Sequence, residues 1–163
     1  MKEIQFKSLF AEIKYQLTLM GSDGMKKGKL LNSEISYVLS KMGHTDTITV
    51  GDCGLPIPNG VQRIDLAVTK GLPEFIPVLS AVLEELFIEK VILAEEILKN
   101  NPDLNNEVIE LVKAAEKEEK RTIEIEYIVH EKFKKLTEQS KAVIRTGEYK
   151  AYANIILVSG VTF

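Results

Sequence analysis

Short apolar runs of strand length alternate with stretches of helical periodicity along most of this chain, and this alternation constrains the fold more than any other feature. Runs of four to eight residues rich in β-branched side chains are typical of strands, and apolar residues spaced three and four apart are typical of helices. Because the two patterns alternate, the sequence predicts a three-layer α/β/α domain built on a largely parallel, mixed sheet. The predicted strands are Thr47–Val50, Ile64–Val68, Lys90–Ala94, Ile123–Tyr127, Ala142–Ile144 and Ile155–Val158.

The stretches between these strands have helical signals. Capping residues, a proline that a first turn tolerates, and a terminal glycine mark several of the expected ends. The predicted helices run from Asn32 or Ser33 to Gly43, from Leu72-Pro73 to about Phe87, from Pro102 to Lys120 and from Glu131 to Ser140, with a short helical piece after Glu95-Glu96.

The first 24 residues have a different character from the rest. Their apolar residues recur at helical spacing and would form an amphipathic stripe. Gly21–Gly24 then indicates a flexible joint, and Met25 resembles a second start. We expect residues 1–24 to be an appended leader and residues 25–163 to be the functional domain. The alternative is a native helix that docks on the domain through its stripe (Phe6, Leu9, Phe10, Ile13 and Leu17).

Composition limits the classes of function. The 163 residues suit one domain with its own core. A net charge of −3, with no cluster of basic residues, excludes a nucleic-acid-binding surface. The single cysteine, Cys53, excludes an internal disulfide and fits a reducing cytoplasm. Since no run of about 18 apolar residues occurs, no membrane span is expected.

Two histidines are the residues best suited to moving protons near neutral pH. His44 follows a predicted helix, where it could simply stabilise the negative end of the helix dipole. His130 lies at the end of a predicted strand, where it could simply bond to the backbone. The histidines and Cys53 match no common zinc spacing, and no phosphate-binding glycine loop occurs. No metal or nucleotide cofactor is expected.

Three other polar residues are suited to binding hydroxyl groups. Asp52 falls just past a predicted strand, and it is either a turn former or a carboxylate that binds neighbouring hydroxyls. Tyr152 and Asn154 offer a phenol and an amide, although they could equally be ordinary residues before a strand. Glu95 and Glu96 do not indicate a hydrolase pair, since adjacent strand residues point to opposite faces.

Several separated motifs, in this order along the chain, resemble those of the D-ribose pyranase family of sugar mutarotases. The resemblance covers Met25 to Phe163, and only Cys53 departs from the alanine that is commonest there. The motifs are Gly43-His44-Thr45-Asp46, Asp52-Cys53-Gly54-Leu55-Pro56-Ile57-Pro58, His130-Glu131-Lys132-Phe133-Lys134 and Tyr152-Ala153-Asn154.

This resemblance implies roles for individual residues. His44 matches the family's acid/base, and the substrate-binding positions are Asp52, His130, Tyr152, Ala153 and Asn154. The implied reaction converts the β-pyranose form of free D-ribose into the β-furanose form, without a cofactor. The alternatives are a ribose-binding accessory protein without catalysis and a fucose-type mutarotase.

The resemblance also implies a ring-shaped homo-oligomer, a decamer of two pentameric rings. The order of residues agrees with a shared site, because ligands gather beyond the carboxyl ends of strands. Asp52 and His130 follow their strands, whereas His44 precedes its strand. We therefore expect that one subunit alone does not bring all three together.

Overall fold

The computed structural model describes residues 28–162 of the chain. The chain divides into two units, Met1–Leu31 and Asn32–Phe163, and every helix and strand named below belongs to the second. The predicted leader, Met1–Gly24, lies outside the described residues.

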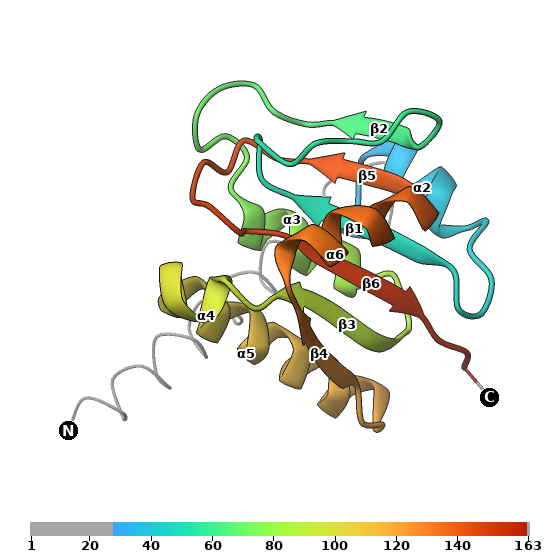
Figure 1. The fold of residues 1–163 in the computed structure, drawn as a ribbon. Helices are drawn as coiled ribbons and strands as arrows, with labels where there is room; N and C mark the ends of the chain where they lie inside the picture. Colours follow the sequence, from blue (N-terminus) through green and yellow to red (C-terminus); the bar gives the residue numbers. More distant parts are fainter. Residues whose placement is uncertain (1–27, 163) are drawn as a thin grey trace. The chain divides into compact units, whose positions relative to one another are not determined.

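Six strands form one mixed sheet in the order β2-β5-β1-β6-β3-β4 (Figure 1). Five strands run in one direction, and β6 alone runs antiparallel to both of its neighbours, β1 and β3. The largely parallel, mixed sheet predicted from the sequence is confirmed. Its strands are β1 (Thr47–Gly51), β2 (Gln62–Asp65), β3 (Ile88–Ala94), β4 (Glu124–Ile128), β5 (Ser140–Arg145) and β6 (Ile155–Ser159).

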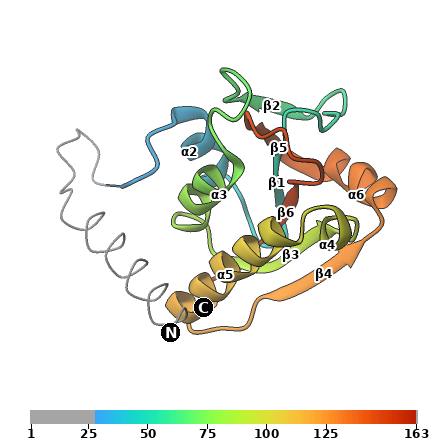
Figure 2. The ribbon, with the colours of Figure 1, turned by 90° about the vertical axis from the view of Figure 1, so that its left-hand side faces the viewer.

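Helices cover both faces of this sheet, which gives the predicted three layers (Figure 2). One face carries α2 (Ser33–Leu39), α3 (Phe75–Leu83) and α5 (Pro102–Glu119), and the short α4 (Ile97–Asn100) packs against α5. The opposite face carries α6 (His130–Leu136), which continues into a 3-10 turn at Thr137–Gln139.

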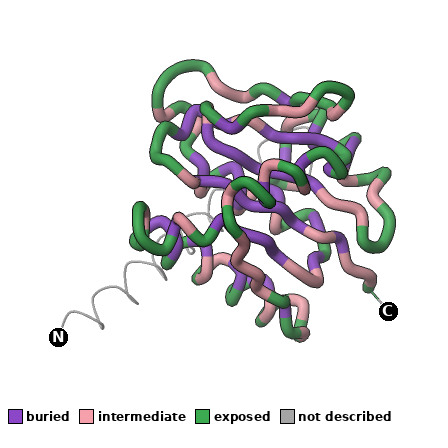
Figure 3. The backbone as a smooth tube through the Cα atoms, in the orientation of Figure 1, coloured by how far each residue is buried: buried purple, intermediate pink, exposed green. Residues whose placement is uncertain are grey.

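The middle strands are buried along most of their length, because helices cover them on both sides (Figure 3). Strands buried on both faces are expected to be apolar runs rather than alternating patterns. On the α6 side, one cluster joins residues from the sheet, the loop after β1 and the helix. It consists of Leu55, Ile92, Phe133, Val143 and Ile156.

β4 forms one edge of the sheet and has the alternating sequence pattern of a half-buried strand. Its carboxylates, Glu124 and Glu126, lie 3.1 Å and 2.6 Å from the Lys90 ammonium of the neighbouring β3. Charged side chains on an edge strand discourage pairing with other sheets. The strand predicted from the period-two pattern is confirmed, but the four residues after Glu124 are all partly buried, so exposure does not alternate along it.

Two predicted helices are shorter than expected. α2 ends at Leu39 rather than at Gly43, because the Lys41 and Met42 amides donate to carbonyls three residues earlier instead of four. α3 begins at Phe75 rather than at Leu72, whose amide instead bonds to the Thr69 carbonyl in a turn.

Two further boundaries differ from the prediction, one because of a side chain and one because of strand pairing. The predicted strand Ile64–Val68 ends at Asp65, whose carboxylate accepts the Ala67 amide at 3.1 Å and turns the chain. The predicted helix Glu131–Ser140 ends at Leu136, and Ser140 instead begins β5 and pairs with Thr47.

Candidate active site

The carboxyl-end edge of the sheet gathers five of the six residues predicted to form the site. Asp52 directly follows β1, and His130 lies one residue past Val129, which follows β4. Tyr152, Ala153 and Asn154 lead into β6. Because β6 runs against its neighbours, its first residue lies at the edge where the other strands end.

Asp52 and Asn154 form a reciprocal pair at the centre of this edge. The Asp52 amide donates to Asn154 Oδ1 at 2.9 Å, and Asn154 Nδ2 donates to Asp52 Oδ2 at 2.9 Å. The Gly54 amide donates to Asp52 Oδ1, also at 2.9 Å. Burial raises the pKa of the Asp52 carboxyl, while these hydrogen bonds and the nearby His130 act in the opposite direction. Gly54, Leu55 and Asn154 direct three donors at the carboxylate, which has about four lone-pair sites, so at least one site is left for a ligand hydroxyl.

Gly51 makes this pair possible. A Cβ atom there would lie 2.8 Å from Asn154 Oδ1 and 2.7 Å from the Leu55 side chain. Both distances are shorter than real contacts allow, so any side chain at Gly51 would push Asn154 away from Asp52. Glycine is used where backbone and neighbouring groups approach closely.

His130 begins α6, and its ring lies between two aromatic side chains. Its ring stacks on Phe133 at a centroid distance of 6.1 Å and meets Tyr152 edge-on at 5.2 Å. Tyr152 adopts φ = 64°, an uncommon backbone conformation that is often kept at functional sites. Within the described residues, His130 Nδ1 is buried and has no hydrogen-bond partner. A buried nitrogen of this kind is suited to a ligand hydroxyl.

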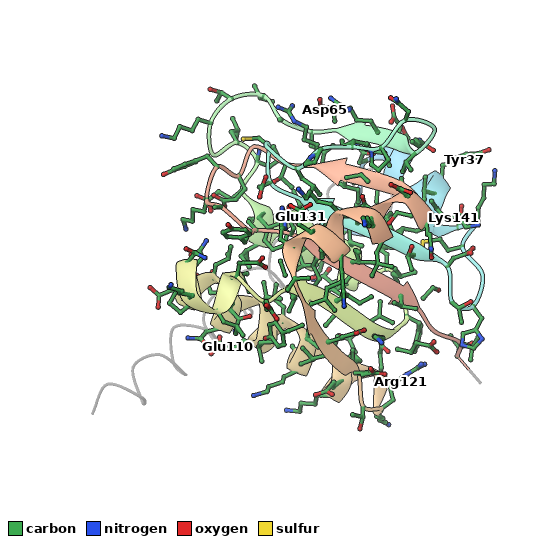
Figure 4. The ribbon with its side chains drawn as sticks, viewed as in Figure 1. Tyr37, Asp65, Glu110, Arg121, Glu131 and Lys141 are labelled. Carbon is green, nitrogen blue, oxygen red and sulfur yellow. The ribbon has the colours of Figure 1, made fainter. Side chains whose placement is uncertain are left out.

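Three residues that sequence reasoning missed hold this edge in place. Both carboxylate oxygens of Glu96 accept the His130 amide at 3.0 Å, which fixes the start of α6. Arg145 Nε donates to the Cys53 carbonyl at 3.1 Å, and its Nη1 donates to Asp65, which is labelled in Figure 4. Each of these three residues ends a strand or follows one at this edge, and that position in the sequence was the signal that could have identified them.

His44 lies at the opposite edge of the sheet, before β1 begins. The Thr45 amide bonds to the carbonyl of Ser159, the last residue of β6, at 2.9 Å. Asp46 pairs with Lys141, labelled in Figure 4, at 3.1 Å. Since a five-residue strand spans about 17 Å, one chain does not bring His44 to Asp52. The separation expected from strand order is confirmed.

The His44 ring is itself paired. Its Nε2 lies 2.8 Å from Glu89 Oε2 on β3. The two histidines of the chain therefore occupy different edges and different surroundings, one in an aromatic cluster and one beside a carboxylate.

The carboxyl-end edge offers hydrogen-bond acceptors, an amide and aromatic faces, a combination that suits a small polyhydroxylated ligand. Across residues 28–162, no three His, Cys, Asp or Glu side chains are grouped as metal ligands. In the same part of the chain, no helix is both long enough and apolar enough to cross a membrane.

Comparisons with known proteins agree with these features. The model of the RbsD / FucU transport protein family matches residues 25–162. The chain is 55% identical over 139 residues to the D-ribose pyranase of Photorhabdus laumondii and 52% identical to that of Glaesserella parasuis. Each match covers 85% of this chain and the whole relative.

Solved structures share the fold. The structure of Bacillus subtilis RbsD complexed with D-ribose is similar with a TM-score of 0.78 and 45% identity, over 85% of this chain and 100% of that one. A fucose mutarotase from Streptococcus pneumoniae has a TM-score of 0.66 and 23% identity over 82% of this chain and 95% of its own, which is a likeness of fold alone.

Replacing Asn154 with Asp tests the reciprocal pair. The variant would place a second carboxylate against Asp52, so at neutral pH the folded state holds a proton that the unfolded state has lost. Stability must then fall as pH rises. We expect near wild-type stability at pH 4 and a loss of about 3 kcal/mol at pH 7, measured by urea unfolding at one fixed protein concentration.

Asn105→Asp is the matched control, because Asn105 is also buried and its Oδ1 only accepts, from the Tyr127 hydroxyl at 2.9 Å. A carboxylate there faces no second carboxylate in that bond. Equal pH slopes in the two variants would contradict the pairing of Asp52 with residue 154.

Proposed function

The chain belongs to the RbsD / FucU transport protein family, and from that premise we propose that it interconverts the pyranose and furanose ring forms of free D-ribose. One observation carries the proposal. The Asp52–Asn154 pair lies at the same sheet edge as Tyr152 and His130 Nδ1, which has no hydrogen-bond partner among residues 28–162. The high identity to relatives named D-ribose pyranase supports ribose as the sugar.

The reaction needs only proton transfers. A base takes the proton of the anomeric hydroxyl while an acid protonates the ring oxygen, so the C1–O5 bond breaks and an open-chain aldehyde forms. The 4-hydroxyl then adds to C1, its proton returns to the protein, and the aldehyde oxygen takes a proton back. No atom or electron is gained or lost, and positioned acid–base catalysis typically gives about 10²–10⁴-fold acceleration.

In this proposal, the carboxyl-end edge binds the sugar and His44 moves the proton. Asp52, His130, Tyr152, Ala153 and Asn154 hold and orient the hydroxyls. Because His44 lies at the other edge of its own sheet, the complete site takes His44 from a neighbouring copy. A closed ring of identical subunits repeats such a head-to-tail contact at every interface.

We extend the proposal to the assembly and its location. In a ring-shaped homo-oligomer, a decamer of two pentameric rings, every subunit would have a neighbour whose His44 edge completes its site. The single cysteine, Cys53, fits a reducing cytoplasm. Apart from neighbouring copies of this chain, the proposed reaction requires free ribose as its only partner.

His44→Gln tests the proton-transfer role. Glutamine keeps hydrogen bonding but cannot titrate, so ring exchange should fall about 10²-fold or more while ribose binding persists. NMR saturation transfer between the ring forms of ribose measures the exchange, and L-fucose provides the comparison sugar. Normal exchange in His44→Gln would remove His44 from the mechanism. Ribose binding by the wild-type chain without exchange would identify a binding protein instead.

Mixed assemblies test whether the site is shared. Subunits carrying His44→Gln should be refolded together with subunits carrying Asp52→Asn, each inactive alone. If each site takes these residues from two copies, random mixing restores about a quarter of the sites. If both residues act within one copy, no mixture regains ring exchange. Each variant refolded alone, in the same way and at the same total concentration, is the control.

Deletion of Met1–Gly24 tests the division of the chain into leader and domain. We propose that residues 25–163 suffice, since the family model begins at residue 25. Ring exchange and the size of the assembly by light scattering should both stay unchanged. A leader docked through its apolar stripe would contribute roughly 1.5–3 kcal/mol per buried side chain, and its removal would alter assembly size or thermal stability.

A further inference from the structure

Glu89 is the one acidic side chain that contacts the His44 ring in the described residues, and three features of the backbone bring the two together. Glu89 Oε2 lies 2.8 Å from His44 Nε2. The pair joins the turn before β1 to the beginning of β3, 45 residues later. Neither motif analysis nor the carboxyl-end rule for sites points to Glu89.

The first feature is an irregularity in β3. Ile88 pairs with Ser159 and Lys90 pairs with Val158, so two steps along β3 match one step along β6 and Glu89 is the extra residue. Bulges of this kind redirect a side chain and are common beside active sites. The irregularity lies at the residue that meets His44.

The other two features fix the backbone around His44. Thr45 adopts φ = 67°, an outlier for a β-branched residue, and its amide is bonded to Ser159. Asp46 accepts the Gly43 amide at 2.9 Å and pairs with Lys141. The turn is therefore held from both sides although the His44 side chain is 52% exposed.

We infer that Glu89 is a positioning residue that fixes the orientation of the His44 ring and makes Nδ1 the nitrogen that exchanges protons with the sugar. An ionised carboxylate only accepts hydrogen bonds, so the neutral imidazole must carry its proton on Nε2. Nδ1 then keeps its lone pair and acts as the base. When Nδ1 takes the sugar proton, Glu89 stabilises the imidazolium through the same contact.

This inference rests on the proposed function, because it assigns Nδ1 a role only if His44 transfers the proton. The geometric part of the inference is the tautomer of the His44 ring, which can be measured without an activity assay. The chain has only two histidines, so the imidazole nitrogens of ¹⁵N-histidine-labelled protein are readily assigned with the aid of His44→Gln.

The test uses Glu89→Ala and Glu89→Gln in the full chain. We expect the wild-type neutral His44 ring to carry its proton on Nε2 alone, and Glu89→Ala to show a mixture of both tautomers. The turnover number should fall about tenfold to a hundredfold, the loss that is typical when a partner orienting a metal-bound histidine is removed. KM for ribose should stay unchanged, because Glu89 contacts the His44 ring rather than the residues proposed to bind the sugar. Glu89→Gln, which keeps an acceptor, should show a smaller loss than Glu89→Ala.

Glu126→Gln is the matched control. Glu126 is also a partly exposed carboxylate near β3, but it pairs with Lys90 at 2.6 Å rather than with a histidine. It should leave the tautomer and the turnover number unchanged. An unchanged tautomer in Glu89→Ala overturns the inference, and so does a changed tautomer with an unchanged turnover number. Full ring exchange in His44→Gln would instead refute the proposed role of His44, whatever the tautomer.

Discussion

The direction of β6 is the constraint on which both candidate halves of the site depend. β6 runs antiparallel between β1 and β3 in a sheet whose other strands all point the other way. Its beginning therefore reaches the edge where β1 ends, so that Asn154 bonds to Asp52. Its end reaches the opposite edge, where Ser159 accepts the Thr45 amide beside His44. With β6 parallel to its neighbours, Asn154 would lie at the His44 edge instead.

β3 plays a complementary part, because it carries a carboxylate at each end. Glu89 meets the His44 ring near the beginning of the strand, and Glu96 accepts the His130 amide two residues past its end. The two contacts differ in kind. Glu89 contacts a ring nitrogen, which is the basis of its proposed effect on the proton, whereas Glu96 binds the backbone and so fixes the position of α6. Each histidine is thereby held by a carboxylate from the segment that begins at β3.

The sequence was informative where a pattern extends over several residues. Apolar runs, and one alternating pattern at β4, predicted all six strands, and strand order placed Asp52 and His130 together while separating His44 from them. It was less informative where one specific hydrogen bond or ion pair, near or distant along the chain, decides the structure. α3 begins three residues later than expected since Leu72 bonds to Thr69, and β2 ends early since Asp65 bonds to Ala67. Glu89, Glu96 and Arg145 looked like ordinary surface charges because their partners lie 34 to 92 residues away.

The two edges also differ in the burial and pairing of their charged side chains, and this difference fits a site divided between two subunits. Asp52 is buried, its carboxyl pKa is raised, and an amide and backbone groups surround it. These are conditions for orienting hydroxyl groups with little side-chain motion. His44 is half exposed and paired with a carboxylate, so its ring stays accessible to a ligand from outside its own sheet. Under the proposed function, a subunit would bind the sugar at one edge and present a proton carrier at the other, and it would be incomplete alone. If the proposed sharing holds, assembly is a condition of catalysis, because only a neighbour's edge brings His44 against the bound sugar.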